Sequence, residues 1–265
     1  MELDGCNALI TGASAGIGLE FVRQLAPPAT TLILVARRRQ RLEELRLELA
    51  AENKKLRVEI RPTDLSKKDE IEELLRWLKA EKLIVDLLIN NAGLGDLGSF
   101  ATSSTERNEE MMLVNMVALT RLTRALLPPM IARKRGAILN VSSSAGFLPI
   151  PGFAIYAASK AYVTSFSEAI FSELRGTGVT VTALCPGPVH TEFNDVAQRP
   201  GGERDHSPEF VYVPVKQVVR DALAAVEADR PLVIPGFLIK VGMFLVRLTP
   251  MSILRWASRF SAKRG

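Results

Sequence analysis

The chain has 265 residues, 47% of them hydrophobic and 24% charged, enough apolar material to bury a full core in one α/β domain. Two cysteines and two histidines are too few for a disulfide framework or a zinc site of His and Cys ligands, so we expect no bound metal. The net charge of +5 comes from residues 230–265, which hold seven basic side chains and no acidic one, and this uneven placement argues against a nucleic-acid-coating protein.

Short apolar segments alternate with helical patterns along most of the chain. This alternation predicts a parallel sheet covered by helices on both faces, a doubly wound Rossmann fold. We predict strands, some with their exits, at residues 6–11, 31–36, 57–66, 85–93, 137–141, 179–185 and 232–234. We predict the main helices at residues 19–26, 39–52, 67–79, 106–130 and from 154 to about 175.

A glycine-rich turn, Gly12-Ala-Ser-Ala-Gly-Ile-Gly18, follows the first predicted strand and precedes a helix. Glycines let the backbone approach a pyrophosphate, and the amino terminus of a helix offers unpaired N–H groups and a partial positive charge. The turn therefore indicates a dinucleotide site, although a plain turn would read the same way. The residues expected to contact the cofactor here are Gly12, Ser14, Gly16, Ile17 and Gly18.

The second predicted strand ends at Ala36 and is followed by Arg37 and Arg38. An acidic residue at this strand end usually binds the ribose hydroxyls of NAD, whereas arginine accommodates the 2′-phosphate of NADP. The sequence therefore predicts NADP(H), bound chiefly by Arg37. We expect Arg39 and Arg41 to pair with glutamates of their own helix instead.

A hydroxyl, a phenol and an ammonium come together in the sequence at Ser143, Tyr156 and Lys160. Tyr156 and Lys160 stand four residues apart on a predicted helix and so share one face, where the ammonium would lower the phenol pKa. Such a phenol can exchange a proton with a carbonyl oxygen, which the Ser143 hydroxyl could also bind. For any one of these residues alone, an ordinary structural role would be the simpler interpretation.

Four motifs between residues 7 and 191 together resemble the short-chain dehydrogenase/reductase family. They are Thr11-Gly-x3-Gly-Ile-Gly18, Asn90-Asn-Ala-Gly93, Ser143 with Tyr156-x3-Lys160, and Pro186-Gly187 followed by Thr191. The resemblance implies a single domain over residues 1–235 with strand order 3-2-1-4-5-6 and the cofactor at the switch point. It also implies a homodimer or homotetramer. Ala15 departs from the pattern, because many NADP-using members have a basic residue there.

The resemblance further assigns residues around the cofactor. Asp64 would accept a hydrogen bond from the adenine amino group with Leu65 against the ring, although Asp64 or Ser66 could also cap the next helix. Asn91, Ala92 and Gly93 would follow the ribose, and a second loop would close over the nicotinamide. That loop contributes Pro186, Gly187, Val189 and Thr191.

Asn115 matches the fourth catalytic position of the family. The resemblance implies that it perturbs its helix and holds a water on a proton path through Lys160. A core asparagine bonded to neighbouring backbone is the alternative, because an unsatisfied buried amide costs roughly 1–3 kcal/mol. The catalytic set is thus expected to be Asn115, Ser143, Tyr156 and Lys160.

These motifs predict an NADPH-dependent oxidoreductase that interconverts a carbonyl and an alcohol, with Tyr156 as proton donor and acceptor. A non-catalytic NADP-binding or membrane scaffold is the alternative. Residues 192–210 are polar and rich in helix breakers, which is typical of a substrate lid. The amino terminus lacks the basic and apolar blocks of a signal peptide, so we expect a cytoplasmic location.

Residues 236–265 are predicted to form a basic amphipathic carboxyl-terminal segment. Lys240 and Arg247 interrupt its apolar run, so it should not cross a bilayer. After Pro250, apolar residues such as Trp256 and Phe260 share one side and basic residues recur on another. The segment suits either an anionic membrane surface or packing on the core or a second subunit. Membrane contact would favour a long-chain keto or acyl substrate.

Overall fold

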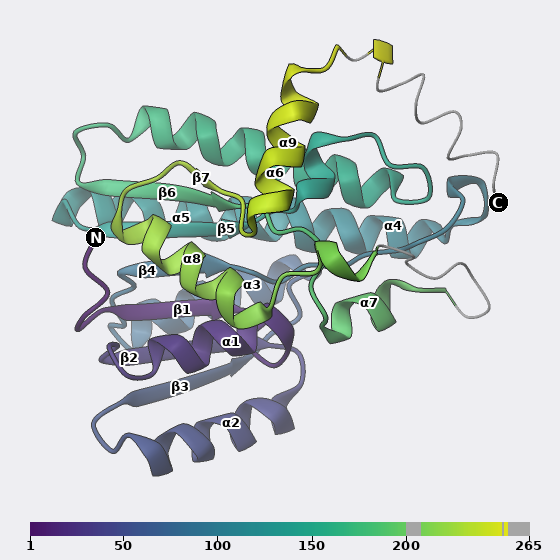
Figure 1. The fold of residues 1–265 in the computed structure, drawn as a ribbon. Helices are drawn as coiled ribbons and strands as arrows, with labels where there is room; N and C mark the ends of the chain where they lie inside the picture. Colours follow the sequence, from purple (N-terminus) through teal and green to yellow (C-terminus); the bar gives the residue numbers. More distant parts are fainter. Residues whose placement is uncertain (200–207, 251, 254–265) are drawn as a thin grey trace.

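The computed structural model describes residues 1–199, 208–250 and 252–253, and its centre is a seven-stranded parallel sheet (Figure 1). The strand order β3-β2-β1-β4-β5-β6-β7 confirms the predicted doubly wound fold, with the short seventh strand at the edge. The strands are β1 (Asn7–Thr11), β2 (Thr31–Ala36), β3 (Arg57–Pro62), β4 (Leu87–Asn90), β5 (Gly136–Val141), β6 (Val179–Leu184) and β7 (Leu232–Val233).

Helices cover both faces of the sheet, because successive side chains of the central strands point to opposite sides. In β1, Ile10 belongs to one buried cluster and Leu9 to the other. The first cluster lies beneath α1 (Gly16–Leu25), α2 (Arg39–Glu52) and α8 (Val215–Glu227). The second lies beneath α3 (Lys68–Ala80), α5 (Leu119–Arg133) and α6 (Ala154–Glu173).

The predicted single helix over 106–130 is wrong in detail, since the segment is divided into three. It consists of α4 (Thr105–Met112), a π-helical turn η2 (Leu113–Ala118) and α5. Asn115 lies in the π-helical turn and is buried, with 1% of its surface exposed. The expectation that Asn115 perturbs its helix is therefore confirmed, and π-helical turns are frequent at functional sites.

Short elements complete the chain around the carboxyl ends of the strands. They are η1 (Phe100–Thr102), η3 (Ser144–Phe147), α7 (Glu192–Ala197) and η4 (Glu209–Val211). The last two belong to the segment that we expect to act as a lid, and residues 200–207 of that segment lie outside the described residues.

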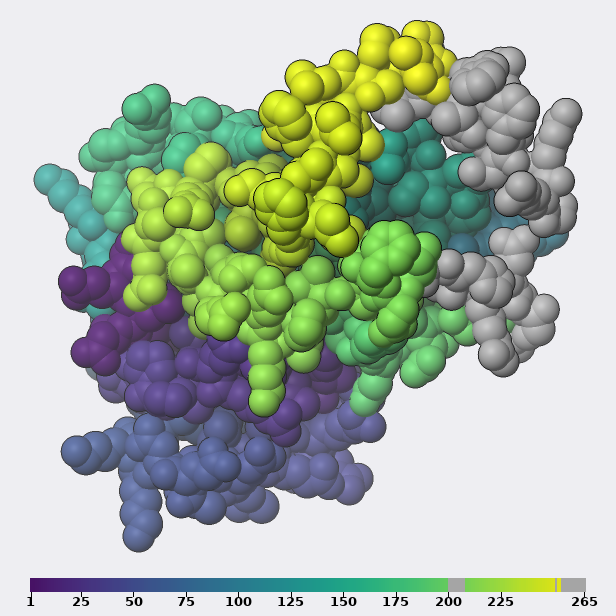
Figure 2. Space-filling view, in the orientation of Figure 1, coloured from purple at the N-terminus to yellow at the C-terminus, as the bar shows by residue number. Residues whose placement is uncertain are grey.

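The last described helix, α9 (Phe237–Leu248), stands on the surface above the sheet edge (Figure 2). Ile239 on its inner side packs on the core, and Met243 lines the cavity described below. Among the helices of the described residues, none has the length and apolar run needed to cross a membrane. The amphipathic pattern predicted after Pro250 lies outside the described residues except for 252–253.

Candidate active site

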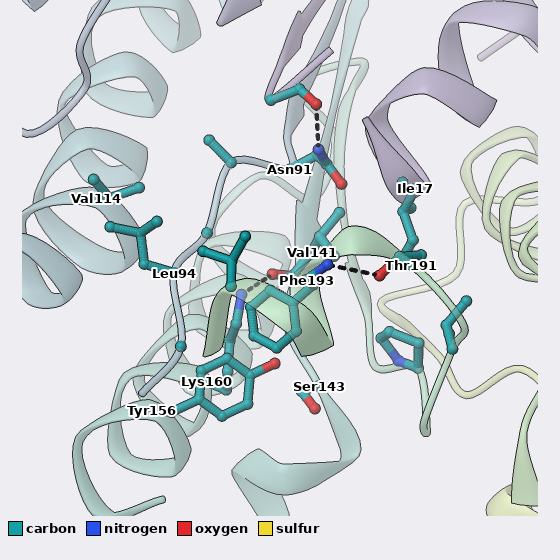
Figure 3. A pocket seen from close by; sticks show the side chains of 18 of the residues that line it. Ile17, Asn91, Leu94, Val114, Val141, Ser143, Tyr156, Lys160, Thr191 and Phe193 are labelled. Atoms are coloured by element: carbon teal, nitrogen blue, oxygen red, sulfur yellow. Dashed lines mark hydrogen bonds between the residues drawn. The ribbon is translucent and has the colours of Figure 1, made fainter. Parts of the chain in front are cut away.

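A cavity of about 630 Å³ lies at the carboxyl ends of the strands (Figure 3). It is formed where the strand order reverses between β1 and β4, the switch point at which doubly wound folds bind ligands. Of the predicted site residues, only Gly18 and Asn115 do not line it. The lining residues that were predicted are Gly12, Ser14, Gly16, Ile17, Arg37, Arg38, Asp64, Leu65, Asn91, Ala92, Gly93, Ser143, Tyr156, Lys160, Pro186, Gly187, Val189 and Thr191.

The glycine turn leaves room for a ligand and cannot be filled with side chains. Gly12 has φ +66°, and a Cβ there would lie 2.7 Å from Nδ2 of Asn91. Gly18 lies behind the turn, where a Cβ would approach the Gly12 carbonyl oxygen to 2.1 Å. Gly18 is therefore a packing glycine that brings α1 close to the turn, and we assign it no direct ligand contact.

The amino terminus of α1 faces this cavity. Ala15 is its cap residue, and within the described chain no side chain accepts a hydrogen bond from the first turn of this helix. The free N–H groups and the helix dipole suit a pyrophosphate. The turn and helix together fit the dinucleotide that the sequence predicts.

Hydrogen bonds fix the end of β4 against the glycine turn. The Thr11 hydroxyl accepts from the backbone N–H groups of Asn91 at 2.9 Å and Ala92 at 3.0 Å. The Asn91 amide donates to the Thr11 carbonyl oxygen at 2.9 Å. These bonds hold the small residues of the strand end along one wall of the cavity, as predicted.

Ser143, Tyr156 and Lys160 meet at the opposite wall. The hydroxyls of Ser143 and Tyr156 point into the same space (Figure 3). The Lys160 ammonium donates to the Val141 carbonyl oxygen at 2.8 Å and lies 5.7 Å from the centroid of the Tyr156 ring. The ammonium therefore approaches the phenol from behind without bonding to it.

Burial governs the ionisation of both groups. Desolvation raises the pKa of Tyr156 to about 12, opposed by a hydrogen bond with Ser143. Desolvation lowers the pKa of Lys160 to about 8. The prediction that Lys160 lowers the phenol pKa is wrong for the ligand-free protein, because the cost of a buried phenolate outweighs any attraction to the ammonium. The phenol is consequently protonated at neutral pH.

Asn115 uses its whole amide within the chain. It accepts from the Leu94 N–H at 2.8 Å, and it donates to the Leu94 carbonyl oxygen at 2.9 Å and to the Ser159 hydroxyl at 3.0 Å. This is the bonding of the alternative interpretation, a core asparagine satisfied by backbone. The side chain holds β4's exit loop against α6, the helix that carries Tyr156 and Lys160.

The arginines after β2 are paired with acids from other elements. Arg37 donates to Glu110 at 2.9 Å, and Arg38 donates to Glu192 at 2.9 Å. Arg39 lies 3.6 Å from Glu43, the predicted partner on its own helix. The same expectation for Arg41 is wrong, since its guanidinium reaches across the cavity mouth to Glu192 at 2.6 Å.

Asp64 organises the turn before α3. Its carboxylate accepts from the Ser66 N–H at 3.0 Å and the Ser66 hydroxyl at 2.7 Å. Neither residue caps α3, whose cap position is Lys67. The Ser66 hydrogen bonds lower the Asp64 pKa against the effect of burial, so the carboxylate at this wall is ionised and able to accept a hydrogen bond.

Several apolar side chains in the cavity were missed from the sequence. Phe153 and Phe193 lie 5.3 Å and 5.4 Å from the Tyr156 ring, centroid to centroid. Leu148, Ile150 and Val196 also contribute. The sequence held a partial signal, since three of these residues fall between the catalytic serine and tyrosine and two fall in the predicted lid, but apolar residues in loops are common and carry no chemical signature.

Comparison with known proteins agrees with this geometry. The model of the family described as short chain dehydrogenase matches residues 6–200. The NADP-dependent 3-hydroxy acid dehydrogenase YdfG of Escherichia coli K12 is 39% identical over 190 residues, which is 71% of this chain and 75% of the relative.

Solved structures extend the likeness over nearly the whole chain. A short-chain dehydrogenase from Sphingobium yanoikuyae in complex with NADPH is 31% identical with a TM-score of 0.81, covering 98% of this chain and 94% of that one. A bulky-bulky ketone specific alcohol dehydrogenase from Comamonas testosteroni is 28% identical with a TM-score of 0.77, covering 93% and 94%. Sequence, fold and site together show that this chain is an oxidoreductase of the short-chain dehydrogenase family.

Proposed function

We propose that the protein is an NADPH-dependent carbonyl reductase, or alcohol dehydrogenase in reverse, for a hydrophobic substrate. The observation that carries this proposal is the pair of hydroxyls, Ser143 and Tyr156, directed into one cavity with the Lys160 ammonium behind them. The cofactor, when bound, supplies the hydride. The Sphingobium relative is in complex with NADPH.

Each residue of the site has a role that follows from its position. The Ser143 hydroxyl binds and orients the carbonyl oxygen, and the Tyr156 phenol gives that oxygen its proton. The phenol is protonated at neutral pH because burial raises its pKa to about 12, which favours reduction over oxidation. Lys160 holds the ribose hydroxyls and eases departure of the proton, and Asn115 positions the helix that bears both.

The wall residues would hold the two halves of the cofactor. The glycine turn and the start of α1 suit the pyrophosphate, Asp64 and Leu65 suit the adenine, and Asn91 to Gly93 follow the ribose. Val189 and Thr191, with Pro186 and Gly187, lie in the cavity where the family closes over the nicotinamide.

We predict that NADPH is preferred over NADH, chiefly through Arg37. Ala36→Asp combined with Arg37→Ala should weaken or reverse the preference, because an acid at the end of β2 binds ribose hydroxyls and repels a 2′-phosphate. The measurement is kcat/KM for both cofactors in wild type and variant. Equal use of both cofactors by the wild type would mean that these arginines only pair with acids such as Glu110.

Apolar residues around the phenol support a bulky hydrophobic substrate. Phe153, Phe193 and Met243 bound the space before Tyr156, and the Comamonas relative is specific for bulky-bulky ketones. NADPH oxidation with a panel of ketones ordered by chain length tests this class. A protein that oxidises NADPH with none of them would favour the alternative of a non-catalytic NADP-binding scaffold.

Peripheral contact with the cytoplasmic face of a membrane is the finer part of the proposal. The outer face of α9 exposes large apolar side chains beside Lys240 and Arg247, without an acidic residue from 230 to the end. An apolar surface with basic neighbours suits anionic lipid. The exposed apolar residues of α9 are Phe237, Leu238, Val241, Phe244, Leu245 and Leu248.

Co-sedimentation with liposomes tests this contact. Binding should require anionic lipid, weaken with salt and disappear when residues 250–265 are deleted or Phe244 and Leu248 are changed to Glu. Leu47→Glu, at a leucine that is 67% exposed on α2, is the matched control and should bind normally. If the intact protein ignores anionic liposomes, the α9 face instead packs on a second subunit in a homodimer or homotetramer.

A further inference from the structure

Glu192, the first residue of α7, lies between two arginines at the mouth of the cavity. Its carboxylate accepts from Arg38 at 2.9 Å and from Arg41 at 2.6 Å. Arg38 also donates to the Ser14 hydroxyl of the glycine turn at 3.3 Å. Ser14, Arg38 and Glu192 line the cavity, so the cluster faces the space that the ribose of a dinucleotide would enter.

The charges of this cluster do not balance. One carboxylate serves two guanidiniums, each of which presents a fork of donors that suits a phosphate. The side chains of Arg38, Arg41 and Glu192 are 44%, 48% and 45% exposed. Ion pairs this exposed are weak, and a phosphate monoester offers more charge and more acceptor oxygens than the carboxylate. The carboxylate is therefore the partner that a phosphate can displace.

The two ends of α7 are held in different ways. The carboxyl end is anchored, since the Leu97 N–H donates to the Ala197 carbonyl oxygen at 2.8 Å and Arg199 donates to Asp96 at 2.9 Å. Glu192 ties the amino end to the arginines. Phe193, the next residue, stacks obliquely against Tyr156 with 5.4 Å between ring centroids. A change at Glu192 thus acts on the end of α7 that contacts the phenol.

We propose that Glu192 is a displaceable counter-ion through which a 2′-phosphate on the adenosine ribose releases the amino end of α7 beside Tyr156. This inference rests on the proposed use of NADP(H). It adds Arg41 to the phosphate site and makes Glu192 a residue that sets both cofactor affinity and the position of α7.

The binding test compares adenosine 2′,5′-bisphosphate with AMP by titration calorimetry. Glu192→Gln removes the competing charge, so its affinity for the bisphosphate should rise three- to tenfold while its affinity for AMP stays within twofold of wild type. Glu43→Gln is the matched control, because Glu43 pairs with Arg39 on the same helix face region and does not line the cavity. The control should leave both affinities within twofold.

The outcomes separate this inference from the cofactor assignment. A wild type that prefers the bisphosphate, with Glu192→Gln unchanged or weakened, overturns the role of Glu192 alone. A wild type that binds both probes equally overturns the NADP(H) assignment and this inference with it.

Hydrogen exchange of the α7 amides tests the release. The Asn194 and Gln198 N–H groups donate within this segment, to Thr191 and Asn194. The bisphosphate should speed their exchange severalfold in the wild type and AMP should not, while Glu192→Gln should exchange fast without ligand. Equal exchange in all of these states overturns the coupling to α7.

Discussion

Replacing Tyr156 by Phe should lower turnover by roughly 10²–10⁴ while NADPH still binds. The change removes one hydroxyl from a buried ring that is packed between Phe153 and Phe193, so the shape of the site is retained and only the proton donor is lost. The measurements are kcat with the best ketone of the panel and the Kd of NADPH by fluorescence.

Tyr162→Phe is the matched control for this prediction. Tyr162 lies on the same helix, is 38% exposed and bonds the Thr120 hydroxyl at 2.8 Å outside the cavity. Its loss should leave turnover within about twofold. Near-normal turnover in Tyr156→Phe would sink the proposed mechanism, since within the described part of the cavity Tyr156 is the residue placed to give up a proton beside Ser143.

The sequence predicted the architecture well because its strands carry a strong local signal. Thr31 to Ala36 is apolar or β-branched throughout and is buried at every position, and the order of the strands follows from the right-handed crossovers of parallel sheets. The predicted glycine turn was also reliable, because positive φ at Gly12 and close approach at Gly18 leave no alternative to glycine.

The partners of charged side chains could not be predicted in the same way. Arg41 was expected to pair within its helix by i,i+4 spacing, but its partner Glu192 is 151 residues away. Only the fold brings α2 and α7 to one edge of the cavity. The same limit applies to Phe193, whose contact with Tyr156 depends on a loop that sequence periodicity does not describe.

The ionisation of Tyr156 was mispredicted for a related reason. The i,i+4 spacing correctly placed Lys160 near the phenol, but spacing does not report burial. Within the protein the Lys160 ammonium bonds the Val141 carbonyl oxygen at 2.8 Å, and desolvation raises the phenol pKa to about 12. A change in charge around the phenol, rather than the lysine alone, must therefore accompany any proton transfer back to it in alcohol oxidation.

Replacing Lys160 by Met should lower turnover by about 10²–10³ and also weaken NADPH binding, which distinguishes it from Tyr156→Phe. Methionine has nearly the same length and fills the same buried space, but it removes the charge behind the phenol and the donor that we assign to the ribose hydroxyls. The exposed Lys79, replaced by Met, is the control and should change neither quantity. A Lys160→Met enzyme with normal NADPH affinity would contradict the assigned ribose contact.

The same variant has a stability signature that activity cannot mimic. Burial lowers the pKa of Lys160 to about 8 from its ordinary 10.5, so between these values the native state binds fewer protons than the unfolded state and stability rises with pH. Wild type should therefore gain stability relative to Lys160→Met between pH 7.5 and pH 10, by on the order of 2 kcal/mol. Urea unfolding of both proteins across this range measures the difference. A difference that stays constant with pH would show that Lys160 is solvated, and that the ammonium does not share the buried surroundings of the Tyr156 phenol.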